Sequence, residues 1–353
     1  MKDSSTYREL IYKVAADEEG ITVREVMATK LSMSGREITR CKQFEDGVCV
    51  CRSDNARETK SASDAETEDT GITLNTVNAG NARSTGNTVT AGVSGKDIYK
   101  PVLVKENLRA GDVLRVRIYE ANESAEEVLP WDHPIDIIYE DEDLIVLNKP
   151  GDMVAHPSYA HYTDSLSNAL MGYYKRSGQI HVIRPIGRLD RETAGLILFA
   201  KNRYSASRLS DQSGNMSRHK EYLAIVNGIL DEKAGTIDAP IERDPSSRMI
   251  RRVDPEGKRA VTHYEVMREF QDYSLVKLRL DTGRTHQIRV HMAHISHPLL
   301  GDGLYGKEIL NNHGMERAAL LASHREFFHP VTGEKCTFDA PIPDDMKRLL
   351  STD

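Results

Sequence analysis

Two neighbouring stretches in the C-terminal half most constrain the fold of this chain. Residues Val261–Arg268 and Tyr273–Leu280 each alternate apolar with polar side chains. Successive side chains of a strand point to opposite faces, so this alternation is typical of strands that are buried on one face. The pattern predicts two half-buried antiparallel strands.

The rest of that half continues in the same way. A mixture of hairpin-joined strands and separate helices predicts an α+β fold with a mixed or antiparallel sheet. The further predicted strands are Ile135–Tyr139, Leu144–Leu147, Gly195–Ala200, Glu221–Val226 and Thr236–Ile241, and helical spacing covers Thr163–Tyr174 and the residues that follow the turn in Gly283–His294.

The first 119 residues suggest a separate small α/β module. Apolar spacing predicts a helix over Val23–Leu31, and a capping box at Ser34–Glu37 predicts a second helix that runs through Phe44. Val48–Cys51 and Val113–Ile118 are predicted strands.

A compositional break interrupts this module. Residues 53–98 are rich in Ser, Thr, Asn, Gly and Ala and contain no aromatic residue. Such a segment cannot bury enough apolar surface to offset the entropy lost on ordering, which predicts a disordered insertion. The expected organisation is therefore a domain over 1–119 interrupted at 53–98, a linker over 120–132, and a second domain over 133–353.

Composition excludes several classes of protein. No stretch approaches the roughly 18 consecutive apolar residues of a membrane span, and the N-terminus carries acids and lacks the apolar core of a secretory signal. The four cysteines lack C-x-x-C spacing, which favours reduced thiols in a cytoplasmic protein, although Cys49 and Cys51 leave a shared ligand open. We expect a cytoplasmic protein that does not interact with membranes.

The net charge of −7 does not by itself exclude nucleic acid. A local basic surface is enough to engage phosphates. One basic cluster comprises Arg184, Arg188, Arg191, Lys201, Arg203, Arg208, Arg218 and Lys220, and a second comprises Arg243, Arg248, Arg251, Arg252, Lys258 and Arg259.

The segment Arg184–Asn202 carries the candidate chemistry. Asp190 lies between Arg188 and Arg191 and directly precedes the apolar run Gly195–Ala200. A strand that follows at once fixes a carboxylate on rigid scaffold, as catalysis requires. Taken alone, the cluster would more often be a surface ion-pair group.

Two other motifs are better explained without a ligand. Gly301–Lys307 fits G-x-x-x-x-G-K, but Glu308 replaces the magnesium-binding Ser or Thr and no apolar strand precedes it. His291, His294 and His297 suggest zinc, but they lie within Gly283–Gly306, one of the segments of the family resemblance described next, and that resemblance implies no metal.

Four segments together resemble the motifs of the RluA-type RNA pseudouridine synthases in order and spacing. They are Asn148–Pro157, Gly187–Asn202, Lys220–Val226 and Gly283–Gly306, and the resemblance covers about residues 133–345. The N-terminal module is similar to the αL-type RNA-binding domain that precedes the catalytic domain in some members. The resemblance implies a pseudouridine synthase fold with a catalytic cleft.

The resemblance also implies an activity and its residues. It implies a cofactor-free isomerisation in which a uridine of structured RNA is flipped out, detached at N1 and rejoined at C5. Asp190 would be the catalytic carboxylate, through attack on the ribose, addition to the base or a glycal. Arg289 would pair with it, Tyr222 would stack on the base and act as acid or base, and Arg188 would fill the vacated position. Further contacts to RNA are expected from Arg191, Lys220, Arg284, Arg36 and Arg40.

One position departs from the family pattern. Gly187 stands where the family usually has a histidine before Arg-Leu-Asp. That position is generally not a proton donor, so we expect activity to survive with changed loop packing. The alternative is a non-catalytic RNA-binding or ribosome-assembly factor. We expect a monomer that acts on ribosomal rather than transfer RNA.

Overall fold

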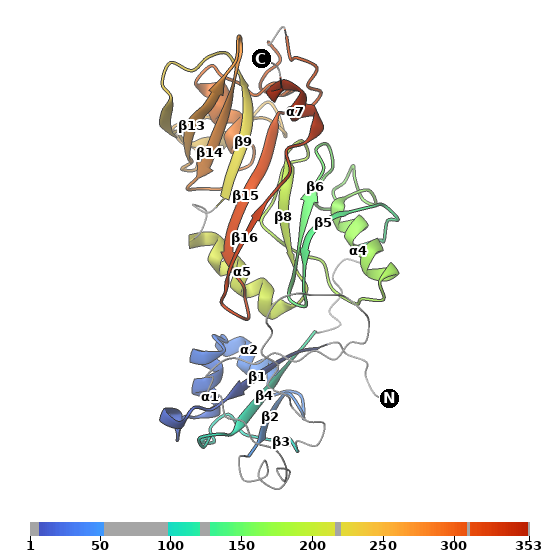
Figure 1. Cartoon of the computed structure of the whole chain (residues 1–353), viewed down its shortest axis with the longest axis vertical. Helices are drawn as coiled ribbons and strands as arrows, with labels where there is room; N and C mark the ends of the chain where they lie inside the picture. Colours follow the sequence, from blue (N-terminus) through green and yellow to red (C-terminus); the bar gives the residue numbers. More distant parts are fainter. Residues whose placement is uncertain (1–6, 53–97, 121–127, 216–219, 309–310, 352–353) are drawn as a thin grey trace. The chain divides into compact units, whose positions relative to one another are not determined.

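A computed structural model describes residues 7–52, 98–120, 128–215, 220–308 and 311–351 (Figure 1). The chain divides into two compact units, residues 1–123 and 124–353. Apart from its last residue, the predicted insertion 53–98 lies outside the described residues, and each unit is described here by itself.

The first unit contains a four-stranded antiparallel sheet. Its order is β1 (Tyr7–Lys13), β4 (Val113–Tyr119), β2 (Val48–Cys51) and β3 (Lys100–Pro101). The strand prediction for Val48–Cys51 is confirmed, and the free thiols of Cys49 and Cys51 are both buried in it.

Short helices pack beside this sheet. After the 3-10 turn η1 (Ala16–Glu18), α1 (Val23–Glu25) continues directly into the π-helical η2 (Val26–Lys30). Ser34 caps α2 (Gly35–Cys41), and its hydroxyl accepts a hydrogen bond from Glu37 N at 3.3 Å. The prediction that this helix reaches Phe44 was wrong. The chain turns back so tightly that a Cβ on Gly47 would lie 2.0 Å from the carbonyl oxygen of Cys41.

The second unit is built on one mixed sheet of ten strands. Along its main path the order is β10 (Ala234–Asp238), β13 (Val261–Glu269), β14 (Tyr273–Leu280), β9 (Lys220–Asn227), β15 (Leu320–Phe328), β8 (Ala194–Ala200), β6 (Leu144–Lys149) and β5 (Asp136–Glu140). In addition, β16 (Lys335–Asp339) pairs with β15, and β7 (Arg184–Ile186) pairs with β8. Only β8 and β15 are parallel among these described pairs, which confirms the α+β fold with a largely antiparallel sheet.

Both faces of the β6–β8 part of the sheet are buried. Leu196 and Leu198 pack with Leu209 of α5 (Arg203–Asn215), whereas Ile197 and Phe199 pack with residues of α4 (Leu166–Arg176). Alternate residues of one strand thus contact opposite layers. This explains why residues 195–200 form a continuous apolar run instead of alternating.

The remaining helices cover other parts of the sheet. Ile288 and Met292 of α6 (Gln287–His294) pack on Val276 and Leu278 of β14, and α7 (Asp344–Leu350) contributes to a third core cluster. No helix among the described residues is long and apolar enough to cross a membrane.

Two boundaries differ from prediction. The single strand expected over Thr236–Ile241 is divided into β10 and β11 (Ile241–Arg243), and β11 pairs with β12 (Arg251–Val253). The break falls at Pro240, which cannot donate to a strand ladder. The helix expected from Thr163 begins only at Leu166, where Ser165 forms its N-cap.

Candidate active site

The candidate catalytic aspartate lies in the loop that joins β7 to β8. The carbonyl oxygen of Asp190 accepts a hydrogen bond from Thr193 N at 3.1 Å, which closes a turn just before β8. The Asp190 side chain is half-buried. Gly187 opens the loop with a φ of +88°, a conformation that favours glycine. Glycine at the position of the family histidine therefore suits the shape of this loop.

Lys149, the last residue of β6, anchors the loop through the backbone of Arg191. Its fully buried ammonium donates to the carbonyl oxygens of Pro150 at 2.7 Å, Met153 at 2.7 Å and Arg191 at 2.9 Å. Three acceptors match the three protons of an ammonium. Burial and the nearby charge of Arg317 lower the pKa of Lys149 to about 7, and the charge of Asp190 opposes this shift.

Contacts between Glu192 and the segment Arg317–Ala318 attach the same loop to the chain that leads into β15. The Glu192 carboxylate accepts from Ala318 N at 2.9 Å, and its backbone carbonyl accepts from the Arg317 guanidinium at 3.1 Å. Arg317 also forms an ion pair with Asp345 at 2.7 Å. The two residues that follow Asp190, Arg191 and Glu192, are therefore held by separate segments, the end of β6 and the chain that leads into β15.

A close approach of two strands brings this loop to β9. A Cβ on Gly195, at φ +106°, would lie 2.3 Å from the carbonyl oxygen of Ala322, so only glycine allows β8 to pair here with β15. Ala322 is in turn the register partner of Tyr222. The glycine that follows the Asp190 loop thus allows β8 to lie against β15, which also pairs with β9, the strand that carries Tyr222.

A small, partly open cavity lies beside the loop. Its lining includes Arg188, Leu189, Lys220, Tyr222, His324 and Arg325. Arg188 is exposed at the cavity, and Tyr222 is half-buried in it. Burial raises the pKa of Tyr222 and the charge of Asp190 adds to this, while Arg325 acts in the opposite direction. The phenol therefore stays protonated near neutral pH and is able to donate a hydrogen bond.

Arg289 has a different direct partner from the one predicted. Its guanidinium is 3% exposed and binds both carboxylate oxygens of Asp302, at 2.7 and 2.6 Å, and Glu192 at 3.3 Å. Burial alone would lower the pKa of Arg289, but the hydrogen bonds and charge of Asp302 raise it, with smaller contributions from Glu192 and Asp190. The charge of Asp190 acts on Arg289, but the buried bidentate pair is with Asp302.

The comparisons with known proteins agree with this arrangement. A family model described as RNA pseudouridylate synthase matches residues 143–294. An uncharacterised RNA pseudouridine synthase of Bacillus subtilis, YjbO, is 42% identical over 249 residues, which cover 70% of this chain and 87% of that protein. The chain belongs to the RluA-type RNA pseudouridine synthases. It is an enzyme that modifies RNA, an isomerase.

Further relatives support the assignment. Ribosomal large subunit pseudouridine synthase D of Escherichia coli is 39% identical over 269 residues, covering 73% of this chain and 81% of that protein. Among solved structures, human RNA pseudouridylate synthase domain containing 1 matches with a TM-score of 0.50 and 25% identity, over 60% of this chain and 84% of that chain.

The other basic residues predicted to contact RNA lie in different settings. Arg191 forms an ion pair with Asp152 at 2.8 Å, and Arg284 donates to the carbonyl oxygen of Arg259 at 3.0 Å. Lys220 lies in the cavity. Arg36 and Arg40 are exposed on α2 of the first unit.

Several synthase residues were missed by sequence reasoning. Asp302 belongs to the glycine-rich segment that resembles a phosphate loop, but its carboxylate instead binds Arg289 and accepts from Leu304 N and Tyr305 N. Lys149 lies in the segment Asn148–Pro157 of the family resemblance, and this was the one feature of the sequence that could have marked it as important. Glu192, Arg317 and Arg325 gave no signal, because their roles depend on contacts between distant segments.

Two of the three histidines that suggested zinc, His291 and His297, have separate hydrogen-bonding roles. Buried His291 contacts Thr262 Oγ1 and the carbonyl oxygen of Ala239, both at 2.9 Å. His297 contacts the carbonyl oxygen of Asn227 at 2.9 Å. The arrangement of these side chains fits structural hydrogen bonding, and the expectation of a metal-free enzyme stays a prediction.

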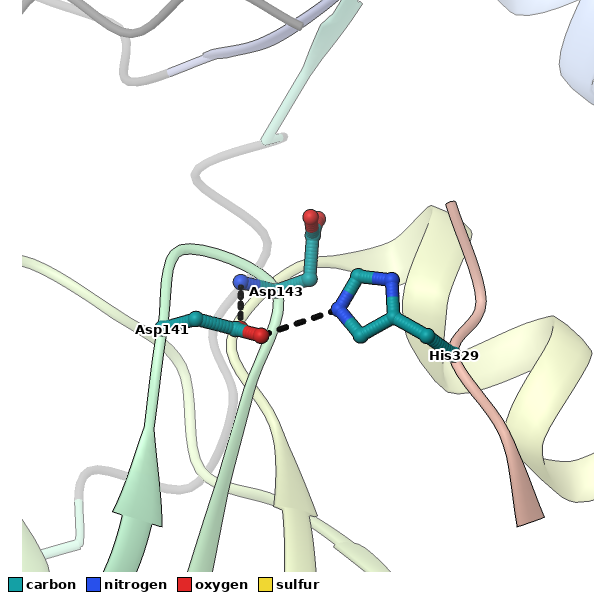
Figure 2. Close-up of side chains that lie close together, drawn as sticks. All are labelled: Asp141, Asp143 and His329. Carbon is teal, nitrogen blue, oxygen red and sulfur yellow. Dashed lines mark hydrogen bonds and ion pairs between the residues drawn. The ribbon is translucent and has the colours of Figure 1, made fainter. Parts of the chain in front are cut away.

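Among the residues that the structure describes, Asp141, Asp143 and His329 form the one group with metal-ligand geometry (Figure 2). Asp141 accepts from His329 Nε2 at 2.9 Å and from Asp143 N at 2.7 Å. The other ring nitrogen of His329 accepts from Val331 N and Thr332 N. This assigns the ring proton to Nε2, so a metal there would have to displace it. The group fits a hydrogen-bonded junction between two turns.

The Lys149 contacts lead to a first prediction. We expect Lys149→Met to lower the free energy of unfolding by about 1–3 kcal/mol, because three carbonyls lose their buried donor. Urea unfolding followed by the fluorescence of Trp131, the one tryptophan of the chain, measures this in the second unit. The exposed Lys233→Met serves as control. Equal stability of the two variants would contradict the anchoring role.

Proposed function

We propose that this synthase isomerises particular uridines of ribosomal RNA, with Asp190 as the catalytic carboxylate and Tyr222 and Arg188 at the flipped base. The observation that carries the proposal is the convergence of these residues. Arg188 and Tyr222 line one cavity, and Asp190 is close enough to affect the ionisation of Tyr222, Lys149 and Arg289.

The reaction needs only a carboxylate and proton transfers. The C1′–N1 bond of the nucleoside breaks and a C1′–C5 bond forms, while C5 loses a proton and N1 gains one. Atoms and electrons balance without an oxidant or a group donor, which is consistent with a cofactor-free enzyme. A rigidly held Asp190 supplies the carboxylate, and the protonated phenol of Tyr222 supplies a hydrogen-bond donor at the base.

Base flipping explains the roles proposed for Tyr222 and Arg188. Unstacking a uridine costs a few kcal/mol, and stacking on an aromatic ring returns roughly 1–3 kcal/mol. The half-buried ring of Tyr222 is the aromatic surface in the cavity. Arg188 is exposed and has no ion-pair partner among the described residues, so its guanidinium is available to occupy the position that the base leaves.

We assign the first unit to RNA docking. Arg36 and Arg40 lie four residues apart on α2, on one exposed helix face where both can reach phosphates. The relatives named as ribosomal large subunit synthases support ribosomal over transfer RNA. We further propose that the enzyme acts as a cytoplasmic monomer.

The test maps pseudouridine in RNA from a strain that lacks the gene. Carbodiimide-dependent stops in ribosomal and transfer RNA should show at least one missing site, and we expect that site in ribosomal RNA. The wild-type gene should restore it, whereas a gene carrying Asp190→Asn should not. A complete set of sites in the deletion strain would favour the non-catalytic assembly factor, and a missing site in transfer RNA would overturn the substrate assignment.

A further inference from the structure

A bulge in the sheet places a second basic residue opposite Lys220. Tyr222 pairs with Ala322, but the register between β9 and β15 then shifts, so that Lys220 pairs with Arg325. Without the extra residue, His324 would occupy that position. Bulges commonly re-aim a side chain next to a functional site. Here the bulge aligns two cations on one face of the sheet.

Neither cation has a carboxylate partner among the residues that the structure describes. The side chain of Lys220 forms no hydrogen bond or ion pair with any described residue. Arg325, 7% exposed, donates to a single acceptor, the carbonyl oxygen of Ile186, at 3.3 Å through each terminal nitrogen. The acids beside them are engaged elsewhere: Glu221 with Arg279 and Glu326 with Lys335.

Three other buried cations of the same unit have carboxylate partners, and a fourth, Lys149, has all three of its protons donated to carbonyl oxygens. Arg289 binds Asp302, Arg317 binds Asp345, and Lys201 binds Glu140. Burying like charges without a counter-ion is unfavourable. Burial and the charge of Arg325 lower the pKa of Lys220 to about 7, and burial lowers that of Arg325 to about 10. A bound anion would supply the counter-charge that Lys220 and Arg325 lack.

The spacing of Lys220 and Tyr222 along β9 fits the size of a nucleotide. Lys220 and Tyr222 are two residues apart on one strand, or about 7 Å. This is close to the separation between the base of a nucleotide and its own phosphate. The Asp190 loop passes beside this lysine, since a Cβ on Gly187 would be in ordinary van der Waals contact with Lys220 Nζ, at 3.7 Å.

We propose that Lys220 and Arg325 form a phosphate-binding subsite that holds the phosphodiester next to the flipped uridine. The subsite rests on the proposed function, because the base stacked on Tyr222 defines which phosphate reaches it. Fixing that phosphate orients the ribose toward Asp190. Lys220 and Arg325 are thus positioning residues, distinct from the groups that touch the reacting bonds.

The test compares two small probes on the full-length protein. One is the dinucleotide UpU, and the other is its methylphosphonate analogue, which keeps both bases but has no charge on the linker. Lysine labelled with ¹³C at Cε allows binding to be followed by NMR at Lys220, whose resonance is identified by its absence in Lys220→Met. We expect UpU to shift this resonance and to bind about tenfold more tightly than the analogue.

Matched variants separate the subsite from general charge. Binding in the variants is followed through the fluorescence of Trp131 or the resonances of other lysines. Lys220→Met and Arg325→Met should remove most of the preference for UpU, and Lys220→Arg should retain it. Lys347→Met, which removes an exposed lysine paired with Asp344 on α7, should leave the preference unchanged. Trp131 fluorescence reports whether Arg325→Met remains folded, and Lys220→Met decides the question if it does not.

Two results would overturn the subsite: equal affinity for the two probes, including no binding of either, or a preference that survives Lys220→Met. These results are independent of the RNA mapping. Missing pseudouridine sites together with equal affinities would leave the proposed function intact and remove the subsite. A Lys220-dependent preference in a protein that forms no pseudouridine would do the reverse, leaving phosphate binding in place and removing its catalytic purpose.

Discussion

Asp190→Asn is expected to slow pseudouridine formation by at least about 10³-fold while leaving RNA affinity within a few-fold. The substitution keeps the size of the side chain and removes its negative charge. The loop itself is held by contacts that do not involve this carboxylate, namely those of Lys149, Glu192 and Arg317. The variant should therefore fold and bind RNA normally.

Single-turnover assays on an RNA that contains the mapped site measure the rate, and filter binding measures the affinity. Asp152→Asn is the matched control, because Asp152 is 63% exposed and forms a surface ion pair with Arg191 at 2.8 Å. It should keep nearly full activity. If Asp190→Asn instead lost RNA binding at an unchanged rate of the bound complex, Asp190 would be a binding residue.

The sequence was sufficient to nominate site residues that stand within a short motif, and their roles stay predictions. Asp190 and Tyr222 stand in recognisable local patterns, and alternation located β13 and β14 because each is buried on one face. The apolar run of β8 was recognised as a strand, although only the structure explains why it does not alternate.

Contacts between distant segments were beyond that reasoning. Alternation cannot reveal the bulge that turns Arg325 toward Lys220, because the extra residue changes the pairing of β15 without changing its composition. The bidentate partner of Arg289 was missed for a similar reason. The Asp302 carboxylate that binds the buried guanidinium lies 13 residues further along the chain, and no local pattern indicates this contact.

The Arg289–Asp302 pair leads to the second large effect. Arg289→Met is expected to lower the free energy of unfolding by about 3–5 kcal/mol, because it leaves the fully buried Asp302 carboxylate without its counter-charge. Urea unfolding followed by Trp131 fluorescence measures the change in the second unit. Arg259→Met is the control: its guanidinium is 73% exposed and 4.0 Å from Asp238, so its loss should cost at most about 1 kcal/mol.

A double variant separates the two roles of this arginine. In Arg289→Met with Asp302→Asn the buried pair is neutral, and the amide oxygen can still accept from Leu304 N and Tyr305 N. At least about 1 kcal/mol of the lost stability should return. Activity should stay low, because the positive charge that acts on Asp190 is still missing. Recovery of both stability and turnover would mean that Arg289 only supports the fold, and additive losses of stability would mean that Asp302 is not its partner.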